Sequence, residues 1–362
     1  MSLGEATAVS TAPLPDPRQL EIRDFGSYAL IIDARSPREY ANDHIPGAIS
    51  LPVVNDSEYA EVGTRHKDDP HAAYLIGTQY ALRNIASMVE SLIVKYKPDD
   101  RILVYCFRGG KRSKLWADNL RTIGYQVDVV PGGWKSYRRW VMASLETLPR
   151  SFEYRVLSGS TGTGKTRLLH ALSRIIQQVL DLEALASHRG SLLGAVPDEL
   201  QPSQKLFDTL LLDALRKMDP ARPVWIEAES KKIGNLQLPI GLFEAMIRST
   251  PLHISAPMSE RVRLWREDYA HFAKAPATLV ELLTPLKPII GGDELDRWRE
   301  LAAQDQVDEL FARVMSQHYD PSYERSTRRS YSTFPLSHRI DLDSLLPERL
   351  DKVAADLAAR FG

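Results

Sequence analysis

A single cysteine stands at the head of a short basic loop in this 362-residue chain. It is Cys106, and the residues that follow it are Phe107, Arg108, Gly109, Gly110, Lys111, Arg112 and Ser113. Between a strand and a helix, such a loop turns successive backbone N–H groups into one concavity, which binds anions. Together with the three cations, these groups should lower the pKa of the thiol and make it a nucleophilic thiolate at neutral pH. The alternative interpretation is a buried, inert structural cysteine.

A second loop, residues 159–166, matches the phosphate-binding motif G-x-x-x-x-G-K-[ST] at every required position. Its residues are Gly159, Ser160, Thr161, Gly162, Thr163, Gly164, Lys165 and Thr166. An apolar strand-like run precedes the loop and an apolar helical run follows it, as the motif requires. We predict that its N–H groups bind a diphosphate, that Lys165 reaches the terminal oxygens and that Thr166 can ligate Mg²⁺. The motif does not predict hydrolysis, and it leaves open whether ATP or GTP binds.

Two carboxylates, Glu227 and Glu229, end a predicted strand where NTPases usually carry a magnesium-binding Asp. They would act on Mg²⁺ through water or position a substrate; the alternative is a pair of solvated strand-end side chains. None of the nine histidines has a metal-ligand spacing, so we assign no intrinsic metal beyond Mg²⁺ that accompanies a diphosphate.

Basic residues are concentrated between positions 101 and 140, where nine Lys and Arg accompany two acidic residues although the net charge of the chain is −1. A nucleic-acid partner requires a local positive surface of this kind. The candidate RNA contacts are Trp134, Lys135, Arg138, Arg139, Arg328 and Arg329. The alternatives are a solvated helix face for the first group and a solvated connector for the last two. For Arg261, Arg263 and Arg266, an exposed basic face is favoured over a cationic lid on the phosphates.

Alternating strands and helices surround these loops and predict parallel sheets with ligand sites at the strands' carboxyl ends. The predicted strands are Tyr28–Ile32, Ile102–Tyr105, Val127–Val130, Tyr154–Leu157, Val224–Glu227, Leu252–Ser255 and Arg339–Leu342. The predicted helices are Ala72–Tyr96, Lys114–Ile123, Thr166–Leu180, Ser203–Met218, Ser259–Ala273, Thr278–Leu286, Leu295–Met315 and Pro347–Phe361. The length is about 2.4 times a typical domain, so we predict two α/β domains, 17–148 and 149–362, after a loose leader 1–16.

Composition excludes several classes of protein. Hydrophobic residues make up 43% and charged residues 26%, which is ordinary globular usage and excludes a disordered chain. One cysteine excludes intrachain disulfides and zinc ribbons and suits a reducing cytosol. The leader lacks the basic and apolar regions of a signal peptide, and no apolar run approaches ~20 residues, so we predict no membrane span.

The first domain resembles the rhodanese family. The resemblance rests on the motifs Ile31–Tyr40, His44–Ile49, the Cys106 loop and Pro131–Trp134. It implies a loop cysteine that carries a chalcogen as a persulfide. The spacing from Cys106 to Arg112 is C-x5-R, one residue longer than in the usual sulfurtransferase loop. Rhodanese-like phosphatases and arsenate reductases share the longer loop, which fits a tetrahedral oxyanion.

The whole chain after the leader resembles the tRNA 2-selenouridine synthase family, in which a rhodanese-like domain precedes a P-loop NTPase-like domain. Further matching segments are 188–191, 201–207, 227–234 and 318–321. The resemblance implies a cytoplasmic enzyme that replaces sulfur by selenium at the wobble 2-thiouridine of tRNA. It implies S-geranylation with geranyl diphosphate at the P-loop, and then selenation with selenophosphate, whose selenium Cys106 would accept as a selenosulfide. An enzyme that supplies selenophosphate is the implied protein partner.

Two other functions remain open from the sequence. One is a rhodanese-type sulfurtransferase or C-x5-R phosphatase joined to an ATP-dependent kinase-like domain. The other is a non-catalytic, nucleotide-gated tRNA-binding module in which Cys106 is structural.

Overall fold

The computed structural model describes residues 24–190, 193–194 and 199–362, so the predicted leader lies outside the described residues. The chain divides into two compact units. Unit 1 comprises Met1–Ser144 and Asp208–Leu210, and unit 2 comprises Leu145–Phe207 and Leu211–Gly362. The division falls inside helix α5 (Gly133–Thr147), near the end of the first predicted domain.

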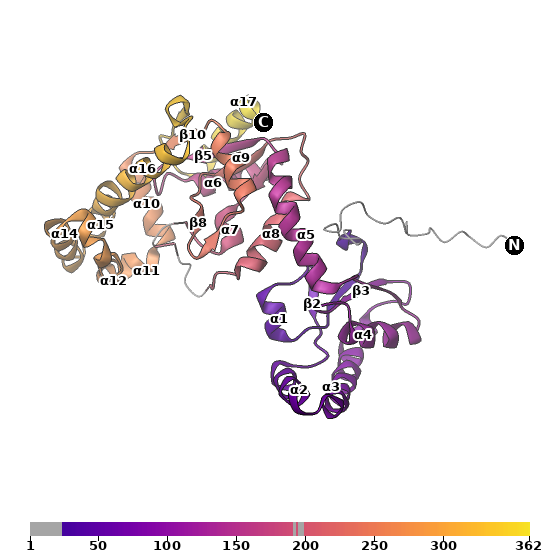
Figure 1. Ribbon diagram of the computed structural model, residues 1–362. Helices are drawn as coiled ribbons and strands as arrows, with labels where there is room; N and C mark the ends of the chain where they lie inside the picture. The colour runs from indigo at the N-terminus through magenta and orange to yellow at the C-terminus, as the bar shows by residue number, and fades with distance from the viewer. Residues whose placement is uncertain (1–23, 191–192, 195–198) are drawn as a thin grey trace. The chain divides into compact units, whose positions relative to one another are not determined.

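Unit 1 is built on a parallel four-stranded sheet with the strand order β2-β1-β3-β4 (Figure 1). The strands are β1 (Leu30–Asp33), β2 (Ala48–Ser50), β3 (Arg101–Tyr105) and β4 (Gln126–Val129). All four residues of β1 are buried, as is the apolar run of β3, because helices cover both faces of a parallel sheet. The carboxyl ends of β1 and β3 therefore lie side by side, with Asp33 in register with Tyr105.

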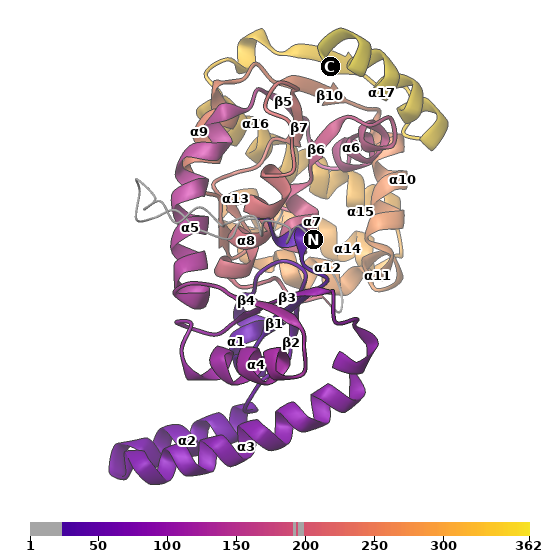
Figure 2. The same ribbon diagram turned by 90° about the vertical axis from the view of Figure 1, so that its right-hand side faces the viewer.

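The helices of unit 1 are α1 (Pro37–Asn42), α2 (Asp56–Asp68), α3 (Pro70–Ser91), α4 (Lys111–Thr122) and α5. The predicted helix over residues 72–96 is therefore only the second member of an antiparallel pair, α2 and α3, which lie side by side in both views (Figures 1 and 2). Strand β2 and helices α1, α2 and α5 add to the elements that the sequence predicts.

Unit 2 contains a parallel five-stranded sheet with the order β11-β10-β5-β7-β6. Its strands are β5 (Tyr154–Ser158), β6 (Gln178–Leu180), β7 (Val224–Glu227), β10 (Leu252–Ser255) and β11 (His338–Asp341), and β8 (Lys232–Ile233) and β9 (Leu236–Gln237) form a separate hairpin. Strand β6 corrects the predicted helix over 166–180. That helix, α6, ends at Arg174, and the chain then turns at Ile176, whose φ is 63°.

The helices of unit 2 are α6 (Lys165–Arg174), α7 (Leu182–Ala186), α8 (Gln204–Leu215), α9 (Ile240–Arg248), α10 (Met258–Asp268), α11 (Ala270–Lys274), α12 (Pro276–Leu283), α13 (Lys287–Ile290), α14 (Gly292–Ala303), α15 (Val307–Val314), α16 (Asp320–Ser330) and α17 (Pro347–Phe361). The predicted helix over 295–315 is wrong as one element, since it breaks at Asp305, whose φ is 55°. A π-helical turn, η5 (Met315–Tyr319), joins α15 directly to α16. Arg328 and Arg329 therefore lie on a helix, α16, so the solvated connector, one of the two interpretations left open for them, is wrong.

Two buried clusters support unit 2. One packs α6, α17 and part of α10 against the sheet, and the other holds together the helices from α10 to η5 around Trp265 and Trp298 (Figure 2). The loop after β5 lies between these clusters, because its Gly164 lies next to Leu345 of the first cluster and its Gly162 next to Trp265 of the second. The predicted fold class, a rhodanese-like unit followed by a P-loop parallel-sheet unit, is confirmed. None of the helices in the described ranges has the length and apolar character needed to cross a membrane.

Candidate functional site

Cys106 follows the last residue of β3 and precedes the N-terminus of α4. Its side chain is 3% exposed, and its Sγ accepts a hydrogen bond from the Gly110 N–H at 3.2 Å and lies 3.2 Å from the Ser113 hydroxyl. Burial raises the pKa of the thiol, but hydrogen bonds from Ser113, Arg108 and Gly110 outweigh burial and lower the pKa. A cysteine loop that favours the thiolate is what nucleophilic chemistry needs.

The three cations of the loop contribute differently from the expectation, because each contacts another side chain. Arg112 binds Glu39 at 2.5 Å, Lys111 Nζ lies 3.3 Å from the centre of the Tyr74 ring, and Arg108 lies over the Phe107 ring. Hydrogen bonds are the main cause that lowers the thiol pKa, and Arg112 also has a charge interaction with Cys106. A shallow cavity of about 330 Å³ opens over the thiol, and its lining is Cys106, Phe107, Arg108, Gly110, Lys111 and Arg112.

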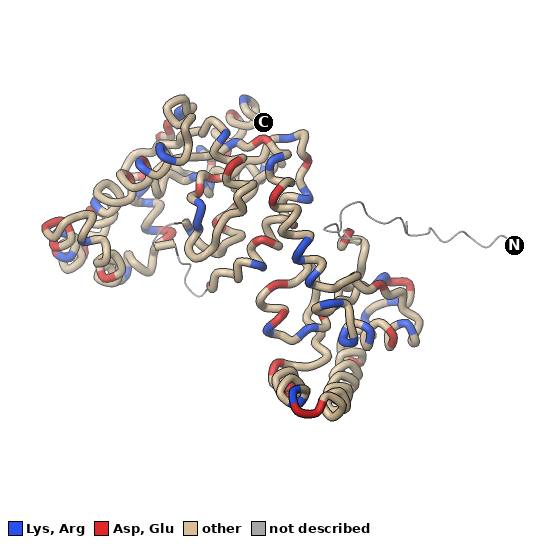
Figure 3. Tube along the Cα trace, viewed as in Figure 1, with Lys and Arg blue, Asp and Glu red and all other residues tan. Residues whose placement is uncertain are grey.

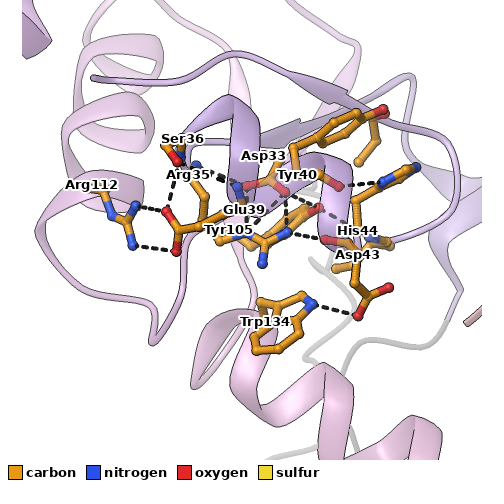
Figure 4. A network of polar contacts seen from close by, with 12 residues as sticks. Asp33, Arg35, Ser36, Glu39, Tyr40, Asp43, His44, Tyr105, Arg112 and Trp134 are labelled. Carbon is orange, nitrogen blue, oxygen red and sulfur yellow. Dashed lines mark hydrogen bonds and ion pairs between the residues drawn. The ribbon is translucent and has the colours of Figure 1, made fainter. Parts of the chain in front are cut away.

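A buried polar network lies at the carboxyl ends of β1 and β3, next to the start of the cysteine loop (Figure 4). Arg35 is 2% exposed and binds both carboxylate oxygens of Asp33, and the Tyr105 hydroxyl donates to Asp33 at 2.7 Å. Arg35 also donates to the Asp43 backbone carbonyl at 2.5 Å. Since Tyr105 immediately precedes Cys106, this network fixes the strand end from which the thiol projects.

Trp134 is part of the same support and is 7% exposed. Its indole N–H donates to Asp43 at 2.8 Å (Figure 4). Its backbone N–H donates to the Cys106 carbonyl at 2.8 Å. The preceding Gly133 has a φ of 60°, and any Cβ there would overlap the Cys106 carbonyl oxygen. The structure therefore corrects the expectation that Trp134 contacts RNA: its ring is buried and positions the loop.

The other candidate RNA contacts differ in how exposed their side chains are and in whether an acidic side chain pairs with them. Figure 3 marks the basic residues along α4, α5 and α16. Lys135 and Arg139 are exposed on the first half of α5. Arg138, by contrast, forms an ion pair with Asp208, and its side chain is only 15% exposed. On α16, Arg329 is exposed, and Arg328 is exposed but paired with Glu324 at 2.8 Å. Burial of the Arg138 charge makes a structural role its better-supported one.

The phosphate-binding motif forms the turn between β5 and α6, as predicted. Gly164 adopts a φ of 80°, which disfavours other residues, and α6 begins at Lys165. The Lys165 ammonium donates to the Gly159 and Ser160 carbonyls, at 2.7 and 3.3 Å. The Gly159 N–H donates to the hydroxyl of Tyr323 on α16, at 2.8 Å. The loop thus has a direct contact with α16, a helix that was not among the predicted elements.

Three carboxylates face the loop, and one of them, Glu183 on α7, is absent from the sequence prediction. The Thr166 hydroxyl lies 3.1 Å from Glu183 and 3.2 Å from Glu227, and Glu227 also accepts from the Glu183 N–H. Burial and the neighbouring Glu183 carboxylate raise the pKa of Glu227 well above its usual range and that of Glu229 to about 8. Glu227 is fully buried, so the interpretation as a solvated strand end is wrong for it.

Among the described residues, no three His, Cys, Asp or Glu side chains are grouped so as to hold a metal ion alone. Thr166 with Glu183 and Glu227 does supply the hard oxygen ligands that Mg²⁺ prefers, and Mg²⁺ commonly completes its shell with water and phosphate oxygens. The residues therefore fit a Mg²⁺ ion that a diphosphate brings with it.

A cavity of about 310 Å³ adjoins the phosphate-binding loop. Gly162 and residues 164–167 form part of its wall, and α10, η5 and α16 contribute Trp265, Tyr319 and Tyr323. The volume is that of a small-molecule site. The sequence signal for Tyr323 as a cavity residue is its helical spacing: Tyr323 and the buried Thr327 are four residues apart, so both lie on the same face of α16.

Arg261 of α10 lies behind the residues that line this cavity, and it is 6% exposed. It donates to the Thr161 carbonyl at 2.8 Å and forms a two-bonded ion pair with Asp320 at 2.6 and 2.9 Å. The expected exposed basic face is therefore wrong for Arg261, which joins the phosphate-binding loop to the start of α16. Arg263 forms an ion pair with Glu260, and Arg266 forms one with Asp308.

Two family models match the chain: the rhodanese-like domain over residues 20–139 and the tRNA 2-selenouridine synthase AAA domain over residues 152–281. A tRNA 2-selenouridine synthase of Marinobacter nauticus is 32% identical over 326 residues, which cover 81% of this chain and 87% of the relative. The enzyme of Aeromonas salmonicida is 31% identical and covers 81% and 86%, respectively. The enzyme of Nitrosomonas europaea is 35% identical over 246 residues, 66% of this chain and 63% of the relative. These matches extend through both units, and the chain belongs to the tRNA 2-selenouridine synthase family.

Proposed function

We propose that this chain converts the wobble 2-thiouridine of tRNA into 2-selenouridine, by S-geranylation with geranyl diphosphate in unit 2 and selenation with selenophosphate at Cys106. The observation that carries the proposal is that one chain combines a hydrogen-bonded thiol on a C-x5-R loop with a phosphate-binding loop facing three carboxylates. The curated relatives bear the name of this activity. The tRNA substrate would place the protein in the cytoplasm.

In the first step, the sulfur of 2-thiouridine attacks the first carbon of geranyl diphosphate, the carbon–oxygen bond breaks and diphosphate leaves. The nucleoside loses its N3 proton, so the alkylated product is neutral. Backbone N–H groups of the loop and the Lys165 ammonium would stabilise the charge that develops on the leaving diphosphate. Lys165 must first exchange its contacts with Gly159 and Ser160 for the ligand. A Mg²⁺ ion near Thr166, Glu183 and Glu227 would add charge neutralisation.

In the second step, the selenium of selenophosphate attacks C2 of the base and geranylthiolate leaves. The Cys106 thiolate then attacks phosphorus, the phosphorus–selenium bond breaks, and 2-selenouridine is released. Water hydrolyses the phosphocysteine to phosphate. No atom changes its oxidation state, and no second thiol is needed, in agreement with the single cysteine of the chain.

This route differs from the selenosulfide that the rhodanese resemblance implies. Moving selenium from selenophosphate onto a thiolate as a selenosulfide leaves phosphorus as phosphite, and a reductant is then needed to release selenium from sulfur. Attack at phosphorus instead matches the length of the loop, which fits a tetrahedral oxyanion, and the hydrogen bonds that favour the thiolate. An enzyme that supplies selenophosphate remains the proposed protein partner.

Nucleoside mass spectrometry tests the proposal. A tRNA that contains 2-thiouridine is incubated with the protein and geranyl diphosphate, and then with selenophosphate. We expect a geranylated nucleoside after the first addition and 2-selenouridine after the second. Sulfur transfer from thiosulfate, or ATP turnover without tRNA, in place of these products would instead support a sulfurtransferase or kinase-like function.

A further inference from the structure

Two half-exposed tyrosines stand beside the cysteine loop, and no step above uses them. Tyr59 on α2 is 48% exposed and Tyr74 on α3 is 47% exposed. Each ring packs against a cation of the loop: the Arg112 guanidinium lies 5.5 Å from the centre of the Tyr59 ring, and the Lys111 ammonium lies 3.3 Å from that of Tyr74. Both helices belong to unit 1, as the cysteine loop does.

The helix pair that carries these rings is firmly held. Glu58, the residue before Tyr59, is 8% exposed and caps α2 through Asn55. It also accepts hydrogen bonds from Asn84 and Arg83 of α3, at 2.8 and 2.7 Å. The rings are therefore presented on a fixed scaffold, so a bound flat ligand would not have to order them.

The chemistry of this surface fits single-stranded RNA. Unpaired bases stack on aromatic rings, and adjacent cations bind the phosphates that join them. Arg108 and Lys111 are exposed and line the cavity over Cys106, so surface cations lie beside the cysteine loop that the two rings contact. A double helix keeps its bases stacked on one another and offers no free base face to such rings.

We propose that Tyr59 and Tyr74, with Lys111 and Arg112, form a stacking surface that receives the unpaired nucleotides around the target base and directs that base to Cys106. The proposal rests on the proposed function for the identity of the RNA. It places the principal contact for single-stranded RNA on α2, α3 and the cysteine loop, a surface that the sequence did not indicate.

Binding of two RNA probes tests the proposal. One is a hairpin RNA with 2-thiouridine in its unpaired loop, and the other is a fully paired duplex of the same sequence. We expect Tyr59→Leu and Tyr74→Leu each to weaken hairpin binding on the order of tenfold, with little effect on the duplex. Tyr59→Phe and Tyr74→Phe keep the ring and should retain binding. Tyr80→Leu is the matched control, because the contacts of Tyr80 are with Glu61 and Arg83 within the helix pair.

Three results would overturn the proposal: unchanged hairpin binding in the Leu variants, an equal loss for hairpin and duplex, or, without RNA, weaker protection of Cys106 by selenophosphate against alkylation with iodoacetamide. The last would assign the surface to the selenium donor. The thermal unfolding midpoint of each variant shows whether it is folded. If wild-type protein binds the hairpin but makes no 2-selenouridine, the proposed function fails and the surface stands. If the Leu variants make 2-selenouridine with unchanged kcat and KM, the surface fails and the function stands.

Discussion

Arg112 of the cysteine loop and Glu39 of α1 form an ion pair at 2.5 Å, with about a fifth of each side chain exposed. The carboxylate therefore neutralises the arginine that the C-x5-R loop would present to an anion. Glu39 also accepts a hydrogen bond from the Ser36 N–H at 3.1 Å, so it has a structural role that a glutamine can keep.

We expect Glu39→Gln to tighten oxyanion binding at Cys106 by about fivefold, because Arg112 gives up a charged partner for a neutral one, a difference of about 1 kcal/mol. The measurement is protection of Cys106 by phosphate against alkylation with iodoacetamide. Glu61→Gln is the control, since Glu61 lies on α2 and contacts Tyr80. Weaker protection in Glu39→Gln would show that the ion pair organises the loop for the anion.

Replacement of Cys106 by alanine should abolish 2-selenouridine and leave S-geranylation intact, because only the second step needs the thiolate. With both donors present, we expect a nucleoside that carries selenium and phosphate to accumulate, and mass spectrometry would detect it. A folded variant that fails equally at both steps would contradict the assignment of one step to each unit.

Replacement of Lys165 by alanine should give the opposite pattern. Loss of one preorganised cation beside the developing diphosphate charge costs on the order of 3 kcal/mol, about 10²-fold in geranylation rate. Selenation of tRNA that has already been geranylated should continue. Single-turnover rates of the two steps, measured separately, check this. An unchanged geranylation rate would exclude the phosphate-binding loop as the geranyl diphosphate site.

Diphosphate binding should weaken above pH 8. Burial, and then the charge of Glu183, raises the pKa of Glu229 to about 8, so Glu229 is mostly neutral below that pH and gains a negative charge above it. The added charge lies on the wall of the cavity beside the phosphate-binding loop, where the diphosphate is proposed to bind. Titration calorimetry with pyrophosphate in a chelating buffer at several pH values measures the effect. Pyrophosphate itself titrates in this pH range, and the Glu229→Gln variant, which lacks the carboxyl, shows that contribution alone. Identical plots of affinity against pH for the wild type and the variant would refute the assignment.

Much of the fold was predictable because central strands of parallel sheets are uniformly apolar. The residues of β7 and β10 agree with the prediction, whereas β2 and β6 escaped it because each is a three-residue strand at the edge of its sheet. The break at Asp305 depends on a single positive φ, which the helical spacing of the apolar residues does not encode.

The cysteine loop and the phosphate-binding loop were predictable because the residues that define each of them are adjacent in the sequence. Glu183 was not, since its place beside Thr166 results from pairing β6 with β7. The burial of Trp134 and Arg138 likewise depends on partners that are distant in sequence, Asp43 and Asp208. A basic local composition could not distinguish these residues from exposed neighbours.

Lys135 and Arg139 are the residues of α5 on which an electrostatic contribution to tRNA binding can be tested without disturbing a buried ion pair. Each phosphate that such a cation neutralises releases counterions, which contributes about −0.7 to −0.9 to the slope of log affinity against log salt. We expect the double variant Lys135→Ala/Arg139→Ala to bind tRNA more weakly and to flatten that slope by roughly one to two units. Fluorescence anisotropy across a salt series measures the slope. Lys95→Ala/Lys97→Ala, outside the basic segment 101–140, controls for net charge. An unchanged slope in the first variant would identify this face of α5 as merely solvated.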